Sequence, residues 1–263
     1  MKAYLFAAKL RIQTALAYRF DILSTIFVQC IVMFAISFFW IAAYGGDDSV
    51  LDVSRKSMLT YTTISILMGN MLTMNVQHRI VDSVKNGNVA VDMLKPVSIY
   101  GLYLAEDIGD FVLSVCQKVI PLFVISTIMF GLPKPSSAIS LILFLISFVF
   151  AYFINWLLAA LLGMCAFQTL SMGAMMAVKS YIIKLLSGSI IPLWFFPHEL
   201  QVVLELLPFV SIYQLPLGIY IGKYTLDDIL PRMGIQLSWV LILLIIFNTV
   251  QKKMADRVLI QGG

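Results

Sequence analysis

Small and hydroxyl-bearing side chains recur at regular intervals within one apolar stretch of the chain. They are Thr62, Ser65, Gly69 and Thr73, at positions i, i+3, i+7 and i+11. On a helix this spacing places all four on one face. In a membrane helix such a stripe either packs against another helix, which is the commoner use, or lines a wet cavity. If the stripe lines a cavity, it forms one half of a candidate translocation pathway.

A second polar face lies further along the chain and contains a lysine. Ser180, Lys184 and Ser187 follow at i, i+4 and i+7. A lysine near the middle of a bilayer costs about 2.5–3.5 kcal/mol on insertion scales, so we expect Lys184 to face the protein interior or a pathway. Lys118 is a second intramembrane cation with the same two interpretations. Ser180, Lys184 and Ser187 form the other half of the candidate pathway, and the role of Lys118 is left open.

The residues needed for catalysis are missing from this sequence. There are only two histidines, no paired intramembrane carboxylates, and no serine or cysteine near a base. Residues 218–224 resemble a phosphate-binding loop, but the glycines stand one residue too close and Tyr224 replaces the required Ser or Thr. The three cysteines match no metal or disulfide spacing. We expect no enzyme, no metal site and no ATP site on this chain.

The composition predicts a polytopic membrane protein. The chain is 60% hydrophobic and only 12% charged, whereas soluble domains carry roughly 25% charged residues. Its mean hydropathy is +0.94. The net charge of +4 is small, and its distribution indicates membrane topology rather than nucleic-acid binding. No removable signal peptide is expected, because the first residues lack a compact apolar block and a cleavage site.

Six apolar stretches predict six transmembrane helices within one membrane domain over residues 1–263. Apolar residues at helical spacing in residues 1–21 predict an interfacial helix before the first span, although a simple extension of that span competes with it. The expected fold class is an all-α membrane protein. The six predicted spans cover residues 22–44, 58–76, 108–130, 138–167, 172–195 and 229–250.

The basic residues predict the orientation of these spans. Lysine and arginine resist translocation and collect on the cytoplasmic side. With both termini inside, ten basic residues fall on the inner side and five on the outer side. The inner ones are Lys2, Lys9, Arg11, Arg19, Arg79, Lys85, Lys95, Lys252, Lys253 and Arg257, and the outer ones are Arg55, Lys56, Lys134, Lys223 and Arg232.

Prolines divide the apolar segment 188–222 into pieces too short to cross a bilayer, because each internal proline removes a helical hydrogen bond. We therefore predict a re-entrant helical hairpin on the outer side, between the fifth and sixth spans. A hairpin at this position would act as a gate. The candidate outer-gate residues are Pro192, Trp194, Pro197 and Pro208.

The inner segment 77–107 contains a turn signal at residues 86–88 and then two possible helical turns. Pro96 would end them. Asp92 and Lys95 share a helical face there, which suits either a solvated connector with a salt pair or a docking surface. From spacing alone the connector is the better interpretation.

Four sequence features together resemble the membrane subunits of type-2 ATP-binding-cassette (ABC-2) exporters. They are YRFD at 18–21, GNVAVDMLKP at 87–96, the proline-rich segment 190–209, and RVLIQGG at 257–263. The resemblance covers nearly the whole chain. It implies a cytoplasmic ABC ATPase partner, which would hold ATP and Mg²⁺, and it reverses the preference for a simple connector. The residues that would couple to the ATPase are Val89, Asp92, Met93, Lys95 and Pro96.

The resemblance also implies that the second and fifth spans meet a second permease chain, in a heterodimer more readily than a homodimer. The expected location is a bacterial inner membrane, with both termini cytoplasmic and lipids around the spans. The expected function is outward movement of a small amphipathic or lipid-like substrate. A passive scaffold that recruits a cytoplasmic partner is the alternative.

Overall fold

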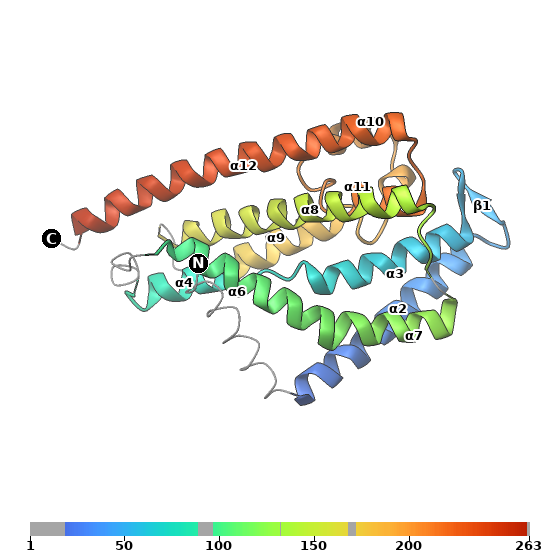
Figure 1. Cartoon of the computed structure of the whole chain (residues 1–263), viewed down its shortest axis with the longest axis horizontal. Helices are drawn as coiled ribbons and strands as arrows, with labels where there is room; N and C mark the ends of the chain where they lie inside the picture. The colour runs from blue at the N-terminus through green and yellow to red at the C-terminus, as the bar shows by residue number, and fades with distance from the viewer. Residues whose placement is uncertain (1–18, 89–96, 132, 168–171, 262–263) are drawn as a thin grey trace.

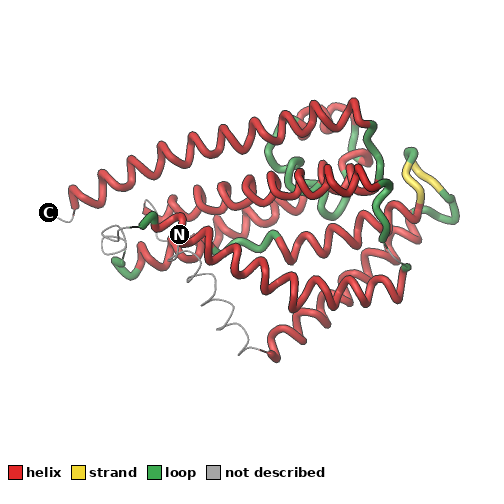
Figure 2. The backbone as a smooth tube through the Cα atoms, in the orientation of Figure 1, coloured by secondary structure: helices red, strands yellow, loops and turns green. Residues whose placement is uncertain are grey.

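The structure, a computed structural model, describes residues 19–88, 97–131, 133–167 and 172–261 (Figure 1). Most of these residues form helices, joined by turns and one very short strand pair (Figure 2). The helices are α2 (Arg19–Ala43), α3 (Arg55–Met71), α4 (Val76–Lys85), α6 (Ile99–Ser114), α7 (Ile120–Phe130), α8 (Ala138–Met164), α9 (Met172–Leu186), α10 (His198–Glu205), α11 (Gln214–Ile221) and α12 (Leu226–Gln261). The strands are β1 (Ser49–Val50) and β2 (Val53–Ser54), paired antiparallel.

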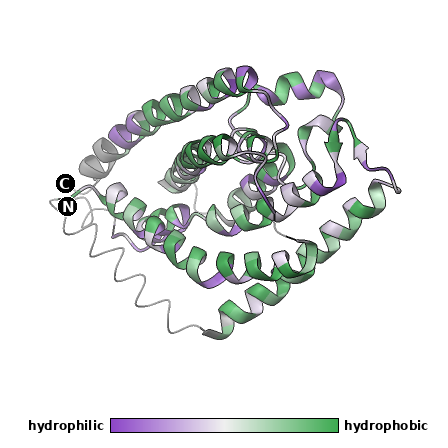
Figure 3. Cartoon of the chain, turned by 45° about the vertical axis from the view of Figure 1, so that its right-hand side comes forward, coloured by the Kyte–Doolittle hydropathy of each residue, from purple (hydrophilic) through white to green (hydrophobic). Residues whose placement is uncertain are grey.

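Among the described residues, four helical stretches are long and apolar enough to cross a membrane. They are Ile22–Ala43, Ile99–Phe130, Ala138–Met164 and Leu226–Met254. They correspond to the first, third, fourth and sixth predicted spans, so the all-α membrane architecture is confirmed. Hydrophobic residues dominate these long helices, and hydrophilic stretches gather toward the ends of the bundle (Figure 3). The predicted second and fifth spans correspond to shorter helices, α3 and α9.

Serine side chains fix where several of these helices begin. Ser54 caps α3 by accepting from the Ser57 amide at 3.1 Å. Ser98 and Ser137 cap α6 and α8 in the same way. An N-cap side chain satisfies one of the amides that has no partner inside the helix. The starts of three major helices are therefore encoded locally.

The second predicted span is not one continuous helix. Helix α3 stops at Met71, residues 72–75 are not helical, and α4 then begins at Val76. Side chains from two other helices satisfy the backbone of this break: Asn155 of α8 donates to the Leu72 carbonyl at 2.7 Å, and Asp107 of α6 accepts from the amides of Asn75 and Val76. Such partners are required, because an unsatisfied peptide group is costly inside a membrane.

The fifth predicted span is also shorter than expected. Helix α9 ends at Leu186 rather than near residue 195. Gly188 follows with φ of +78°, a conformation that favours glycine, and the chain then turns. This turn begins the segment in which the hairpin was predicted.

The connections gather at the two ends of the bundle (Figure 1). The pair β1–β2, the link between α7 and α8, and the segment between α9 and α12 share one end, which we call the β-hairpin end. Two contacts join them: the Tyr220 hydroxyl donates to the Pro133 carbonyl at 2.7 Å, and Lys223 donates to the Leu51 carbonyl at 2.7 Å. Helix α4 and the last turns of α12 lie at the opposite end, which we call the α4 end.

Candidate functional site

A polar groove opens beside the break between α3 and α4. Its volume is about 280 Å³, and its walls come from α3, the break, α4, α8, α9 and the turn before α11. We call it the α9 groove. The side chains used below are Gly69, Thr73, Lys179, Ser180, Lys184 and Tyr213.

Four of the predicted pathway residues meet in the α9 groove: Gly69, Thr73, Ser180 and Lys184 all line it. They come from the two polar faces predicted from spacing, on α3 with its break and on α9. A Cβ at Gly69 would lie 3.6 Å from the Tyr213 hydroxyl, at ordinary van der Waals distance, so α3 and the turn before α11 are close together here. The geometry thus brings the two predicted faces together around one cavity.

The other three predicted pathway residues lie outside the groove. Thr62 is buried and donates to main-chain carbonyls of its own helix. Ser65 is buried and donates to the Ser189 carbonyl at 2.6 Å. Ser187 is fully buried, and its hydroxyl has no partner among the described residues. Around Thr62 and Ser65 the stripe is buried, and Ser65 contacts the chain that follows α9. This part of the stripe therefore serves helix packing, the first of the two interpretations that spacing left open.

A buried polar contact set closes the protein above the groove, toward the β-hairpin end. The Tyr61 hydroxyl lies 2.6 Å from the Gly188 carbonyl and 2.9 Å from Oε1 of Gln214. The same Oε1 accepts from the Leu193 amide at 3.1 Å. A Cβ on Gly188 would lie 2.3 Å from that oxygen, so only glycine fits. This set ties α3, the turn after α9 and α11 into one unit.

The four predicted outer-gate residues differ in how far they are buried. Pro192 and Pro208 are buried, whereas Pro197 is exposed immediately before α10. Trp194 packs edge-on against Tyr61, with ring centroids 5.3 Å apart. Its indole N–H is buried without a hydrogen-bond partner among the described residues.

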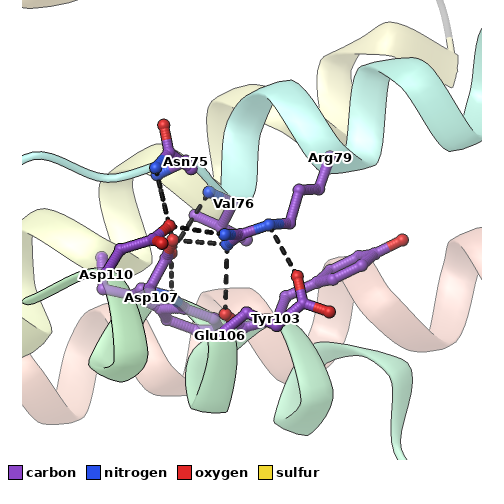
Figure 4. Close-up of polar contacts among 8 residues, drawn as sticks. Asn75, Val76, Arg79, Tyr103, Glu106, Asp107 and Asp110 are labelled. Carbon is purple, nitrogen blue, oxygen red and sulfur yellow. Dashed lines mark hydrogen bonds and ion pairs between the residues drawn. The ribbon is translucent and has the colours of Figure 1, made fainter. Parts of the chain in front are cut away.

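The charged cluster between α4 and α6 is the strongest electrostatic feature of the described chain (Figure 4). Arg79 of α4 pairs through Nε with Glu106 at 2.8 Å and through Nη2 with Asp110 at 2.7 Å. Its Nη1 donates to Asp107, which is fully buried. Burial alone would lower the pKa of Arg79, but Asp107 and Glu106 raise it, and the net pKa lies above its ordinary value. Arg79 therefore remains charged.

Asp107 is held from four directions. Besides Arg79, it accepts from the Asn75 amide at 3.1 Å, the Val76 amide at 3.2 Å and the Trp156 indole at 3.0 Å. A carboxylate at the first turn of a helix also interacts favourably with the helix dipole, and Val76 begins α4. Asp107 thus fixes the break, α4, α6 and α8 relative to one another.

Spacing did not identify this cluster. The sequence predicts a coupling loop over residues 77–107, whereas the structure folds much of this segment into α4 and the start of α6. One sequence signal was available: Glu106, Asp107 and Asp110 gather at the edge of a long apolar stretch, where unpaired carboxylates are costly.

The predicted coupling residues Val89, Asp92, Met93, Lys95 and Pro96 lie outside the described residues. The described chain borders this segment on both sides. Helix α4 ends at Lys85, and α6 begins at Ile99 behind its Ser98 cap. Because the Arg79 cluster joins α4 to α6, it braces both ends of the predicted coupling segment.

Lys118 lies at a second cavity, of about 260 Å³, that shares Thr73 and Asn75 with the α9 groove. It belongs to a π-helical turn, Val115–Val119, between α6 and α7. Pro121 explains the wide turn, because it has no amide to donate to the carbonyl four residues earlier.

The four long apolar helices indicate a multi-pass membrane protein. An interrupted segment such as α3–α4, with a lysine-bearing groove beside it, is typical of the transport class. Residues 30–262 match the family model described as ABC-2 family transporter protein, and the chain belongs to this family. It is thus a membrane permease component of a kind that lacks its own ATP site and generally works with ABC ATPase subunits. Comparison with curated proteins found no match.

Proposed function

We propose that the chain is a permease subunit of an ABC exporter, which moves a small amphipathic or lipid-like substrate outward using ATP hydrolysed by a separate ATPase. The α9 groove is the observation that carries this proposal. It places hydroxyl groups and two lysines around a cavity in a chain that is 60% hydrophobic. Intramembrane polar groups are costly, and they generally mark the path of a transported molecule.

In this proposal the chain crosses the membrane six times, with α3 and α9 as the second and fifth crossings. At 1.5 Å per residue these helices are roughly 26 and 23 Å long, somewhat less than the ~30 Å hydrocarbon core. Residues 72–75 extend the second crossing toward α4, which lies on the cytoplasmic side. The bias of basic residues supports a cytoplasmic α4 end with both termini on that side. A bacterial inner membrane is the proposed location.

The segment 188–222 is proposed to be the re-entrant outer hairpin. Helix α11 supports this, because its first residue, Gln214, contacts Tyr61 within α3, while its last turns contact the links at the β-hairpin end. In this proposal the chain enters the membrane between α10 and Gln214, and α11 then leads it back to the β-hairpin end. Opening of this unit would release substrate outward.

Coupling is proposed to run from residues 89–96, gripped by the ATPase, through α4 to the break at 72–75. The Arg79 cluster would transmit the movement, because it joins α4 and α6 rigidly. Residues 72–75 would change conformation in response to the movement of α4, next to the α9 groove. Such a relay needs two discrete packings that nucleotide biases. A second permease chain, in a heterodimer, would complete the pathway opposite α3 and α9.

Affinity purification of the tagged chain from its own membranes tests this proposal. We expect an ABC ATPase and a second permease to co-purify, and amphiphiles to stimulate ATP hydrolysis by the complex. A passive scaffold predicts a partner without substrate-stimulated hydrolysis. That outcome, or purification without any ATPase, would contradict the proposal.

A further inference from the structure

Lys184 is an exposed cation of α9 for which the described part of the chain supplies no partner. It lies on α9 about three turns from Met172, roughly 18 Å along the axis at 1.5 Å per residue. Its side chain is exposed to the α9 groove. No hydrogen bond or ion pair engages its ammonium group within the described part of the chain. With α9 as the fifth crossing, as the proposed function has it, this charge needs a counter-charge, because lysine is costly within a bilayer.

The α9 groove offers cations and neutral polar groups but no acid. No aspartate or glutamate is among its described lining residues. Lys179, closer to the α4 end, donates to Gln77 Oε1 at 3.2 Å and lies within the field of Asp107. Lys179 is thus partly engaged, whereas Lys184 is free. The hydroxyl-bearing residues Thr73, Ser180 and Tyr213 lie around the same space.

The size of the groove suits a head group rather than a whole amphiphile. Its volume of about 280 Å³ lies at the lower end of ligand pockets. Apolar residues on α9 near Lys184 are more than half exposed, with Val178 at 55%, Tyr181 at 70% and Leu185 at 63%. The hydrocarbon chain of an amphiphile would therefore contact an apolar surface where it leaves the groove.

We propose that the α9 groove binds the anionic head group, a phosphate or carboxylate, of an amphiphile whose hydrocarbon chain remains outside it. Lys184 makes the principal ionic contact, and Lys179 assists. The Tyr213 hydroxyl donates to a remaining oxygen, because the hydroxyls of Thr73 and Ser180 already donate to main-chain carbonyls. This assignment rests on the proposed function, since it gives the transported amphiphile a charge. It extends that function by predicting that the protein selects anionic substrates over zwitterionic or cationic ones.

Native mass spectrometry of the purified complex in nanodiscs of phosphatidylcholine tests binding directly. The probes share one dodecyl chain and carry a phosphate, a trimethylammonium or a glucoside head. We expect selective retention of dodecyl phosphate. Lys184→Gln should weaken it about tenfold, since a hydrogen bond to a charged group is lost. Lys179→Gln should weaken it less, and Lys184→Arg should preserve it. Lys118→Gln is the matched control, because it removes an intramembrane cation from the other cavity.

Equal retention of the three probes, or unchanged retention in Lys184→Gln, would overturn the assignment. Loss of the second permease from the Lys184→Gln complex would also overturn it, because Lys184 would then pair with a carboxylate of that chain. ATP-driven movement of labelled dodecyl phosphate in proteoliposomes identifies the anion as cargo. Binding without movement identifies a resident lipid. Transport indifferent to head group refutes this inference but leaves the proposed function intact, whereas absence of an ATPase partner refutes the proposed function.

Discussion

At the scale of single residues, Asp107 and Arg79 decide the arrangement of the α4 end. A buried carboxylate is tolerated only with several donors, and Asp107 accepts from a guanidinium, two amides and an indole. The three carboxylates around Arg79 leave the cluster with a net negative charge, so Arg79 is the indispensable member. Its planar fork reaches three acids at once, which a lysine cannot do.

Replacement of Arg79 by glutamine should destabilise the protein by about 3–5 kcal/mol, because it leaves carboxylates without their counter-charge. Arg79→Lys should lose less, since the charge remains. Thermal unfolding of the purified chain in detergent measures both. Arg55→Gln is the control, because Arg55 pairs with Asp48 at 3.8 Å on the exposed surface, where ion pairs contribute little. Equal thermal stability of the Arg79→Gln and Arg55→Gln proteins would disprove a structural role for the cluster.

At the scale of elements, the contact between α4 and α8 depends on Gly163. A Cβ at this position would lie 3.0 Å from the Gln77 Cα and 3.1 Å from Cδ1 of Ile80. The two helices therefore approach each other with almost no room to spare. This contact holds α4 beside the break at residues 72–75 and next to the α9 groove.

Gly163→Ala should displace α4 and lower the free energy of unfolding by about 1–3 kcal/mol, because the added methyl group overpacks the contact. This exceeds the ~1 kcal/mol that alanine gains over glycine in a helix. Gly173→Ala on α9 is the matched control, because a Cβ there meets nothing within 4 Å. Unfolding temperatures and substrate-stimulated ATP hydrolysis of the two variants provide the comparison. A Gly163→Ala protein as stable and active as the Gly173→Ala protein would show that the contact is not tight.

Local patterns predicted much of the fold but not how its elements meet. Helix periodicity and hydropathy placed the long helices, and residue spacing found the groove residues Gly69 and Thr73. Spacing could not show that Thr62 is covered by packing, because that depends on where the chain after α9 folds back. The break at residues 72–75 contains no glycine or proline. It is fixed from outside by Asn155 and Asp107, which lie far away in sequence.

At the scale of the whole molecule, the connections between helices divide between two opposite ends of the bundle. The β-hairpin end carries the links from α2 to α3, from α7 to α8 and from α9 to α12, and the α4 end carries the flanks of residues 89–96 (Figure 1). If the α4 end meets the ATPase, the other end faces outward. The bias of basic residues supports this orientation.

Labelling of single cysteines from outside intact cells should distinguish the two ends. With Cys30, Cys116 and Cys165 replaced by alanine, a membrane-impermeant maleimide should label Glu199→Cys and leave Asn86→Cys unlabelled. Both positions are exposed, so accessibility within the protein is matched. Lysed cells provide the control, since both positions should then react. Labelling of both positions, or of Asn86→Cys alone, in intact cells would contradict the orientation.

ATP-dependent movement of a labelled amphiphile in proteoliposomes, using the complex purified through this chain, tests the central claim most directly. We predict movement that requires ATP hydrolysis and is lost in an Asp92→Ala, Lys95→Ala double variant that still folds and still binds the ATPase. Movement without nucleotide, or retained ATP-driven movement in the double variant, would contradict the proposed coupling. Failure of the intact complex to move any amphiphile would contradict the transport function itself.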